Sequence, residues 1–153
     1  MGDEKQHIIT INKKASFSYT LSDFFTCGMK LEGSEIKSIR EKQVNIAESY
    51  CIIHDNEIWV KNMDITRYSF CTNESYNPKK ERKLLLKKTE IKKIKKSLNE
   101  KGMSLIPTKL LISEKGLAKL EIAIGKGKKI YDKRESLKER DAKLEINRKK
   151  REK

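Results

Sequence analysis

The sequence predicts a small, mostly β fold in which an antiparallel sheet closes into a barrel, accompanied by two or three helices and a basic C-terminal tail. Three observations support this prediction. The chain has 153 residues, of which 36% are hydrophobic and 38% charged, as expected of one small domain with a limited core. Short runs of β-forming residues alternate with turn residues along most of it. Basic residues gather at two places, one of them the C-terminal end.

The first half of the chain predicts two strands, a short helix and a β-hairpin. Polar and apolar residues alternate in the first strand, and Gly33 ends the second. Ser34 is a favourable N-cap, and Ile36 and Ile39 give the helix one buried edge. The cluster His54-Asp55-Asn56 is typical of a turn. The expected ranges are frayed residues 1–8, strands 15–21 and 27–31 with a break at 22–23, a helix at 34–42, and hairpin strands 49–53 and 57–61.

The second half predicts a loop, a lysine-rich helix and a second hairpin. Thr89 is the expected N-cap of the helix, and Gly102 is its expected stop. The turn Glu114-Lys115-Gly116 joins the last two strands. The lysines on the helix are expected to form either a nucleic-acid contact or simply a solvated face. The expected ranges are a short strand within 64–71, a loop at 72–82, a helix at 90–99, and strands at 103–113 and 117–124.

Closing these short strands into a barrel leaves no unpaired edge, and at this size the small nucleic-acid-binding barrel of the OB type fits. Phe17, Trp59 and Phe70 are assigned to its core. The predicted organisation is a flexible N-terminus at 1–8, the barrel at 9–124 and the basic tail at 125–153. The tail has few apolar residues, so it is expected to be disordered when free and helical when bound.

The positive charge is concentrated rather than diffuse. The formal net charge is +14. Residues 79–101 carry eleven Lys and Arg against three acidic residues, and residues 125–153 carry thirteen against six. This confinement favours a polyanionic partner, with nucleic acid ahead of an acidic membrane surface or an acidic protein. The glycines of the Gly-Lys-Gly-Lys-Lys run at 125–129 let the backbone approach a phosphate chain, and its lysines neutralise the phosphate charge. The alternative is that this run is a flexible basic linker. Tyr131 is expected either to stack on a base or to pack.

Several classes of protein are excluded by what the sequence lacks. No apolar run approaches the roughly 18 residues of a membrane span, and the charged start is unlike a secretory signal. Cys27, Cys51 and Cys71 are odd in number and widely spaced, which indicates reduced thiols in a cytoplasmic protein. His7 and His54 form no evident catalytic arrangement, and 125–128 lacks the Ser or Thr of a Walker motif. We therefore expect neither an enzyme nor a metal or other cofactor.

Five runs match one bacterial family in order and spacing. Together they resemble SmpB, the small SsrA-binding protein family, from about Ile9 onward, and the last run is the most specific. The runs are NKKA at 12–15, GSEIKSIR at 33–40, the hairpin beginning at 47–50, RKLLL at 82–86, and GKGKKIYDKRESLKERDAK at 125–143.

This resemblance implies an RNA-binding adaptor of trans-translation with an OB-type barrel. The barrel would bind the tRNA-like domain of transfer-messenger RNA (tmRNA, or SsrA RNA). The complex would help deliver alanyl-tmRNA to ribosomes stalled on non-stop mRNA, where the tail senses the empty mRNA channel and the decoding centre. The nascent peptide is then tagged for degradation and the ribosome is rescued. Implied partners are tmRNA and the ribosome, with elongation factor Tu and alanyl-tRNA synthetase acting indirectly through tmRNA; the protein would be a monomer.

The resemblance also implies roles for individual residues. Glu35 would orient basic neighbours or accept a hydrogen bond from a ribose hydroxyl, although a glutamate there is usually a helix-dipole partner. The residues expected to bind RNA are Asn12, Lys13, Lys14, Glu35, Lys37, Arg40, Lys83, Leu85, Lys126, Lys128 and Lys129. Those expected at the decoding centre and mRNA channel are Tyr131, Asp132, Lys133, Arg134, Lys138 and Arg140.

The chain departs from the family pattern at two positions. Thr26 stands where many relatives carry an acidic residue, and Arg67 stands where a proline is expected. The sequence therefore does not predict which of the family's loop contacts form near these two positions. Two other hypotheses remain beside the adaptor: a general ribosome-associated protein that uses the same charges without tmRNA, and an RNA enzyme, which the poor histidine inventory disfavours.

Overall fold

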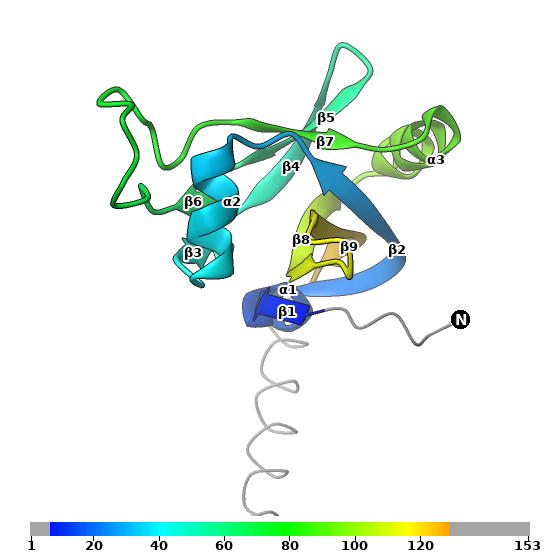
Figure 1. The fold of residues 1–153 in the computed structure, drawn as a ribbon. Coiled ribbons are helices and arrows are strands. Elements are labelled where there is room, and N and C mark those ends of the chain that lie inside the picture. Colours follow the sequence, from blue (N-terminus) through cyan, green and yellow to red (C-terminus); the bar gives the residue numbers. More distant parts are fainter. Residues whose placement is uncertain (1–6, 129–153) are drawn as a thin grey trace, which may run out of the picture.

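Six antiparallel strands close into a ring in the computed structural model, which describes residues 7–128 (Figure 1). Around the ring the order is β8, β4, β5, β7, β2 and β9, and β9 pairs again with β8. β1 adds to β8 beside this ring, and β3 and β6 form a separate pair. The strands are β1 (His7–Ile11), β2 (Tyr19–Met29), β3 (Val44–Asn45), β4 (Tyr50–His54), β5 (Glu57–Lys61), β6 (Asp64–Ile65), β7 (Arg82–Leu85), β8 (Met103–Ile112) and β9 (Ala118–Gly127).

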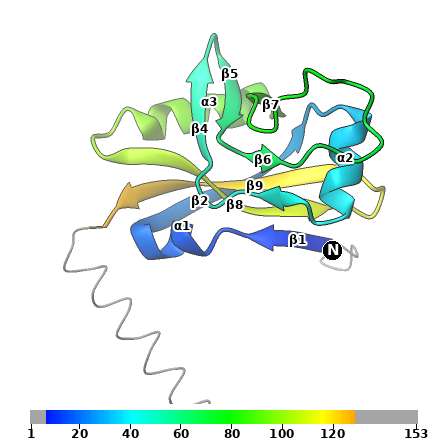
Figure 2. The ribbon, with the colours of Figure 1, turned by 90° about the vertical axis from the view of Figure 1, so that its left-hand side faces the viewer.

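Within residues 7–128, three helices lie around the ring. They are α1 (Lys13–Ser18), α2 (Gly33–Arg40) and α3 (Lys88–Leu98). α2 and α3 lie on opposite sides of it, and α1 lies near the end from which β9 leaves (Figures 1 and 2). Ile39 of α2 and Ile94 of α3 are fully buried, so each helix has one apolar edge against the body of the domain. The predicted mostly-β fold with about three helices is confirmed.

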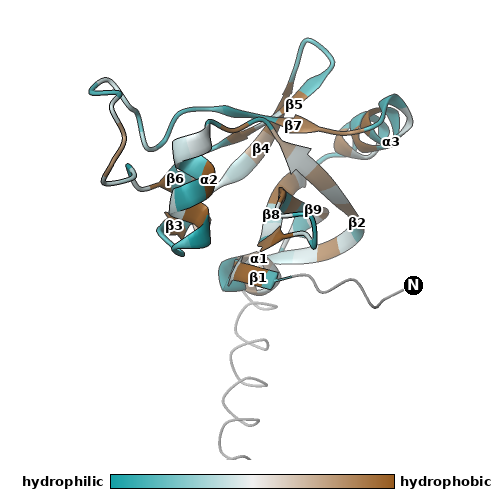
Figure 3. Cartoon of the chain, viewed as in Figure 1, coloured by the Kyte–Doolittle hydropathy of each residue, from teal (hydrophilic) through white to brown (hydrophobic). Residues whose placement is uncertain are grey.

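The core is made by the inward-facing residues of the strands. Ile58 and Val60 of β5 alternate with half-buried residues, as expected of a sheet with one buried face. Leu110, Leu120 and Ile122 of the long hairpin β8–β9 are fully buried, and brown, apolar segments run along this hairpin in Figure 3. Cys27 and Cys51 also lie in the core, and burial raises the pKa of the Cys27 thiol to about 12.

Both predicted hairpins are confirmed. β4 pairs with β5 from Tyr50 opposite Lys61 to His54 opposite Glu57. The two turn residues Asp55 and Asn56 have φ values of 51° and 60°, a left-handed conformation that Asp and Asn tolerate better than most residues. β8 and β9 pair from Met103 opposite Lys126 to Ile112 opposite Ala118, with one register shift between Pro107 and Lys109.

The predicted strand at Ala15–Leu21 is wrong in its first half, because residues 15–18 belong to helix α1. The Ala15 backbone N–H donates to the Asn12 carbonyl at 3.2 Å, and the small Ala15 side chain is 2% exposed. The alternating pattern at Phe17, Tyr19 and Leu21 spans the junction between α1 and β2. So short a pattern does not distinguish one helical turn from a strand.

Other boundaries also differ from expectation. The expected break at Ser22-Asp23 is a bulge within a continuous β2, with Asp23 at φ 47°. Of the expected strand at 64–71 only β6 forms. Residues 7 and 8, expected to be frayed, pair with β8, and β7 begins at the end of the predicted loop 72–82. These elements depend on partners distant in sequence, which local patterns do not show.

The helix caps and one aromatic residue need correction as well. α2 is capped by Glu32 rather than Ser34, and α3 by Lys87 rather than Thr89. Glu35 and Glu90 accept hydrogen bonds from the N–H groups of these two caps, at 3.0 and 3.1 Å. Phe70, assigned to the core, is 81% exposed, whereas Phe17 and Trp59 are half-buried.

The structure extends the sheet slightly beyond the expected end of the barrel. β9 continues through Gly125 to Gly127, pairing with β2 on one side and, up to Lys126, with β8 on the other. A Cβ at Gly125 would lie 3.0 Å from Cβ of Tyr19. Gly125 is therefore needed for close packing between strands. The division of the chain into barrel and tail stays a prediction.

Candidate nucleic-acid interface

Four of the predicted RNA-binding lysines gather where α1 meets the end of β9. Tyr19, directly after α1, lies opposite Gly127, and the Lys128 backbone N–H donates to the Ser18 carbonyl at 2.9 Å. This pairing brings together two segments more than a hundred residues apart in sequence. We call this region the tail-root surface; it comprises Lys13, Lys14, Lys126 and Lys128.

Lys14 on this surface pairs with Glu48. The pair is well exposed, with side-chain exposures of 64% and 72%, and Lys14 lowers the pKa of the Glu48 carboxyl. Exposed ion pairs contribute little to stability, so a phosphate can replace Glu48 as the partner of Lys14 at little cost. The tail-root surface is therefore suited to an RNA backbone.

Asn12, the residue before α1, has a structural role as well as a position at this surface. It is 6% exposed, and its Nδ2 donates to the Pro107 carbonyl at 2.9 Å. Its backbone N–H donates to the Thr108 carbonyl at 2.7 Å. Asn12 thereby fixes the start of α1 against β8.

Glu35 lies inside the protein rather than at a surface. Its side chain is 1% exposed, and its Oε2 lies 2.5 Å from Nε of Arg82, which is equally buried. Lys80 approaches the other carboxylate oxygen at 3.3 Å. Burial opposes ionisation, but the Glu32 backbone N–H, Arg82 and Lys80 outweigh it and lower the pKa of Glu35. Of the two roles expected for Glu35, this geometry favours orienting basic neighbours; a ribose hydroxyl does not reach so buried a carboxylate.

Arg82 is the centre of a network that ties α2 to the loop before β7. Besides Glu35 it reaches four other groups: the carbonyls of Met63, Pro78 and Lys80 at 2.6, 2.9 and 3.2 Å, and the Tyr76 hydroxyl at 3.3 Å. Because every donor direction of this buried guanidinium meets an acceptor, its charge is tolerated in the interior. The RKLLL run therefore begins with a structural arginine.

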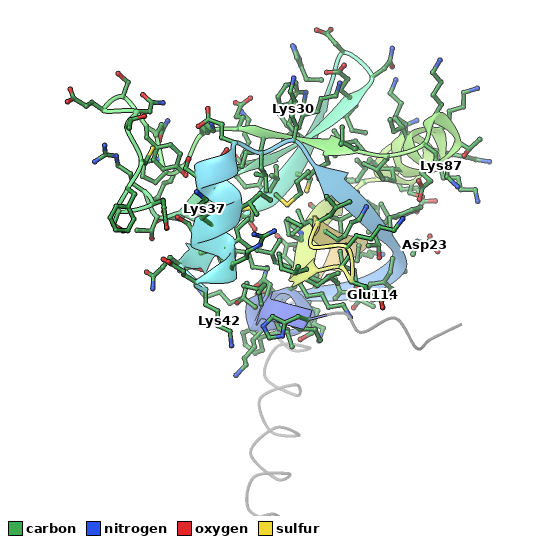
Figure 4. All side chains as sticks on the ribbon, viewed as in Figure 1. Asp23, Lys30, Lys37, Lys42, Lys87 and Glu114 are labelled. Carbon is green, nitrogen blue, oxygen red and sulfur yellow. The ribbon has the colours of Figure 1, made fainter. Side chains whose placement is uncertain are left out.

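Lys37 and Arg40 lie on α2 and Lys83 lies on β7, and each contacts a different partner. Lys37 lies over the Tyr68 ring, with Nζ 5.5 Å from the centroid, and Figure 4 shows it on α2. Arg40 donates to the Gly116 carbonyl at 3.2 Å, and Lys83 pairs with Glu57 at 2.9 Å. The structure thus does not unite these three residues with the tail-root surface.

Leu85 belongs to a second surface. This surface also includes Lys119, which is not among the site residues predicted from the sequence. Leu85 is 51% exposed, unusual for a leucine in a strand. Gly28 pairs with Leu85 on one side and with Lys119 on the other. A Cβ at Gly28 would lie 3.5 Å from Cβ of Leu85 and 3.8 Å from Nζ of Lys119, so both side chains flank the glycine on one face. We call Leu85, Gly28, Lys119 and the exposed Thr26 the Leu85 surface.

The lysines of α3 form a third basic region. Lys87, Lys88, Lys92, Lys93 and Lys96 are exposed, while Ile94 faces inward. In Figure 4, Lys87 lies beside the start of α3, whereas Lys30, directly after β2, lies apart from it. The two predicted roles of this helix face, a nucleic-acid contact and a solvated face, both stay predictions.

The part of the chain between His7 and Lys128 contains no cluster of three or more His, Cys, Asp or Glu suited to a metal ion. Within the same range, none of the helices is long and apolar enough to cross a membrane. Seven residues expected to contact RNA or the ribosome lie outside the described range: Lys129, Tyr131, Asp132, Lys133, Arg134, Lys138 and Arg140.

Comparison with known proteins decides the family. The family model described as SmpB protein matches residues 9–152, nearly the whole chain. The chain belongs to the SmpB family. An SsrA-binding protein of Christiangramia forsetii is 46% identical over 147 residues, which are 96% of this chain and 94% of that protein. One from Flavobacterium psychrophilum is 49% identical, over 93% of this chain and 95% of its own length.

A solved structure agrees with this assignment to the SmpB family. It is described as "tmRNA-SmpB: a journey to the center of the bacterial ribosome". Its chain superposes with a TM-score of 0.68 at 30% identity, covering 84% of this chain and 93% of the other. The resemblance noted in the sequence is therefore confirmed at the level of both family and fold.

Proposed function

We propose that this chain is a non-enzymatic RNA-binding adaptor of trans-translation that binds the tRNA-like domain of tmRNA. It helps deliver alanyl-tmRNA to ribosomes stalled on non-stop mRNA, so that the nascent peptide is tagged and the ribosome rescued. The name SsrA-binding protein borne by its relatives and the tmRNA complex of its structural neighbour support this function. No covalent step is assigned to the chain; it acts by contact.

The observation that carries the proposal is the composition of the Leu85 surface. Gly28 has no side chain and lies between an exposed apolar residue and a cation. A nucleic acid can approach the strand closely there, pack an unstacked base or a ribose on Leu85, and place a phosphate near Lys119. Such recognition uses RNA shape, which charge alone does not supply.

The two departures from the family pattern, Thr26 and Arg67, lie in different parts of the fold. Thr26 is exposed on the Leu85 surface itself, so the missing acidic residue changes the polarity of the proposed tmRNA contact. Arg67 lies in a loop, where its Nη2 donates to the Cys71 carbonyl at 2.8 Å. That bond helps to fold the loop in place of the expected proline.

The remaining partners and roles are part of the same proposal. The tail-root surface lies where the tail begins, so its lysines bind RNA phosphates while Tyr131, Asp132, Lys133 and Arg134 act at the decoding centre. Lys138 and Arg140 then face the mRNA channel. The protein works as a cytoplasmic monomer, and elongation factor Tu and alanyl-tRNA synthetase act through tmRNA.

The substitution Leu85→Ala should weaken binding to the tRNA-like domain about tenfold, because it removes the apolar contact at the centre of the proposed interface. Leu117→Ala is a matched control, since Leu117 is an equally exposed leucine (54%) in the turn between β8 and β9. Affinity is measured by a fluorescence binding titration. Equal affinities of the two variants would contradict recognition through the Leu85 surface.

A further inference from the structure

Phe24 on β2 is an exposed aromatic residue that the proposed function has not used. It is 56% exposed, slightly more than Leu85 at 51%. Contact of so large an apolar ring with water is unfavourable, so a partner that covers the ring gains binding free energy. Within residues 7–128, the ring is not paired with another aromatic ring or with a cation over its face. A partner from outside the chain therefore has access to it.

The bulge at Asp23 directs Phe24 toward the outward face of β2. The even-numbered residues of β9 fill the core, so its odd-numbered residues face outward. Before the bulge, odd-numbered residues of β2 pair with these outward positions. After it, the even-numbered residues Phe24, Thr26 and Gly28 do. Asp23, labelled on β2 in Figure 4, has a φ of 47° and takes up the extra residue.

Phe24 thereby shares its face with the Leu85 surface. Gly28 lies four residues further along the strand, which places Phe24 about 14 Å from it. Lys119 is opposite Gly28 on this face. Lys109 of β8 joins the same face through its pairing with the outward Glu121, whose carboxylate lies 3.2 Å from Nζ of Lys109. The outward face of these strands thus offers an apolar contact at each end and lysines along it.

An exposed aromatic ring with neighbouring lysines is the combination that binds an unstacked base of RNA and the phosphates beside it. Folded RNAs present such bases in loops and bulges. We propose that Phe24 stacks on an unpaired base of the tRNA-like domain, at a fixed distance from the contact made by Leu85. This inference rests on the proposed function and adds a second point of contact on the same face. Stacking accepts any base, so Phe24 recognises where an unpaired base lies rather than which base it is.

The test is a fluorescence titration of full-length variants with the labelled tRNA-like domain. Phe24→Ala should weaken binding about tenfold, the loss typical of removing one base–aromatic contact. Phe24→Leu keeps an apolar side chain but has no π face, and should weaken binding about fivefold. Phe24→Trp should bind at least as tightly as the parent protein. The matched control is Phe70→Ala, because Phe70 is an even more exposed phenylalanine (81%) in the loop between β6 and β7.

An NMR measurement detects the stacked base itself. In protein labelled with ¹³C at its four phenylalanines, the ring signals absent from Phe24→Leu identify Phe24. Addition of the tRNA-like domain should move these ring protons upfield, because they then lie above the ring current of a base. The ring signals of Phe70, identified in the same way with Phe70→Ala, should stay in place. Thermal unfolding of the Phe24 variants should remain near that of the parent protein, since the side chain is exposed.

Three results would overturn the proposal: unchanged affinity of Phe24→Ala, equal losses in Phe24→Ala and Phe70→Ala, or parent-like affinity of Phe24→Leu, which indicates apolar packing without stacking. Failure of this inference is distinguishable from failure of the proposed function. If Phe24→Ala binds like the parent protein while Leu85→Ala binds weakly, the adaptor function stands and the stacking contact is refuted. If the tRNA-like domain does not bind the parent protein, the proposed function itself fails.

Discussion

Truncation after Lys129 should reduce peptide tagging on stalled ribosomes to background while leaving the affinity for tmRNA nearly unchanged. The ring of strands is complete at Gly127, and every residue of the Leu85 surface lies within it. Removal of the tail therefore deletes the proposed decoding-centre contacts but none of the proposed contacts to the tRNA-like domain. Tagging is measured in a reconstituted translation reaction on a non-stop mRNA, and affinity by titration of the same protein.

Substitution within the tail should reproduce this result. The triple variant Asp132→Ala, Lys133→Ala and Arg134→Ala should lose tagging like the truncation. Lys149→Ala with Lys150→Ala is the control, because it also removes two positive charges but lies outside the residues assigned to decoding. A fully active triple variant would refute the decoding-centre assignment, and equal loss of tagging and RNA affinity on truncation would refute the division of labour.

The second large effect concerns stability. Arg82→Met should destabilise the fold by about 3–5 kcal/mol, because it removes the buried charged partner of Glu35 and leaves that carboxylate with Lys80 alone. Lys83→Met is a closely matched control on the same strand. Lys83 is also in an ion pair, with Glu57, but at side-chain exposures of 33% and 41%, so its loss should cost at most about 1 kcal/mol. Urea unfolding gives the free energy of unfolding of both variants. Similar losses in the two variants would contradict the structural role assigned to the buried pair of Arg82 and Glu35.

The same pair predicts a pH dependence. The pKa of Glu35 is lowered from the ordinary value of 4.5 by the Glu32 N–H, Arg82 and Lys80, against the opposing effect of burial. The ionised form therefore stabilises the fold above about pH 4.5, and this contribution is lost as the pH falls through the lower pKa of the folded state. Unfolding at a series of acidic pH values should show a shallower loss of stability in Glu35→Gln than in the parent protein.

Local patterns predicted the elements that local forces decide. The two hairpins and the apolar edge of α2 follow from turn residues, alternation and spacing within a dozen residues. α1 and β7 were not predicted, because each is fixed by residues far away: α1 by the bonds of Asn12 to β8, and β7 by pairing with β2 and β5. The bulge at Asp23 likewise reflects the register with β9.

The candidate site shows the same limit. Motifs within the sequence pointed to Lys13, Lys14, Lys126 and Lys128, and the fold unites them. No pattern, however, indicated that Glu35 pairs with Arg82, 47 positions later in the chain, or that Lys119 lies beside Gly28 and Leu85. The alternation of residues in β9 predicts that Lys119 faces outward. It does not predict which residues of other strands lie beside Lys119. Such pairings follow only from the closed order of the strands.

We propose that the protein recognises the shape of one RNA rather than any polyanion. The most direct measurement is a competition titration in which labelled tRNA-like domain of tmRNA competes with unlabelled tRNA and duplex RNA at two salt concentrations. Contacts to phosphates weaken steeply with salt, whereas contacts through Leu85 do not. We predict that the preference for the tRNA-like domain persists at the higher salt concentration. Its disappearance there would show a general polyanion binder and contradict the account.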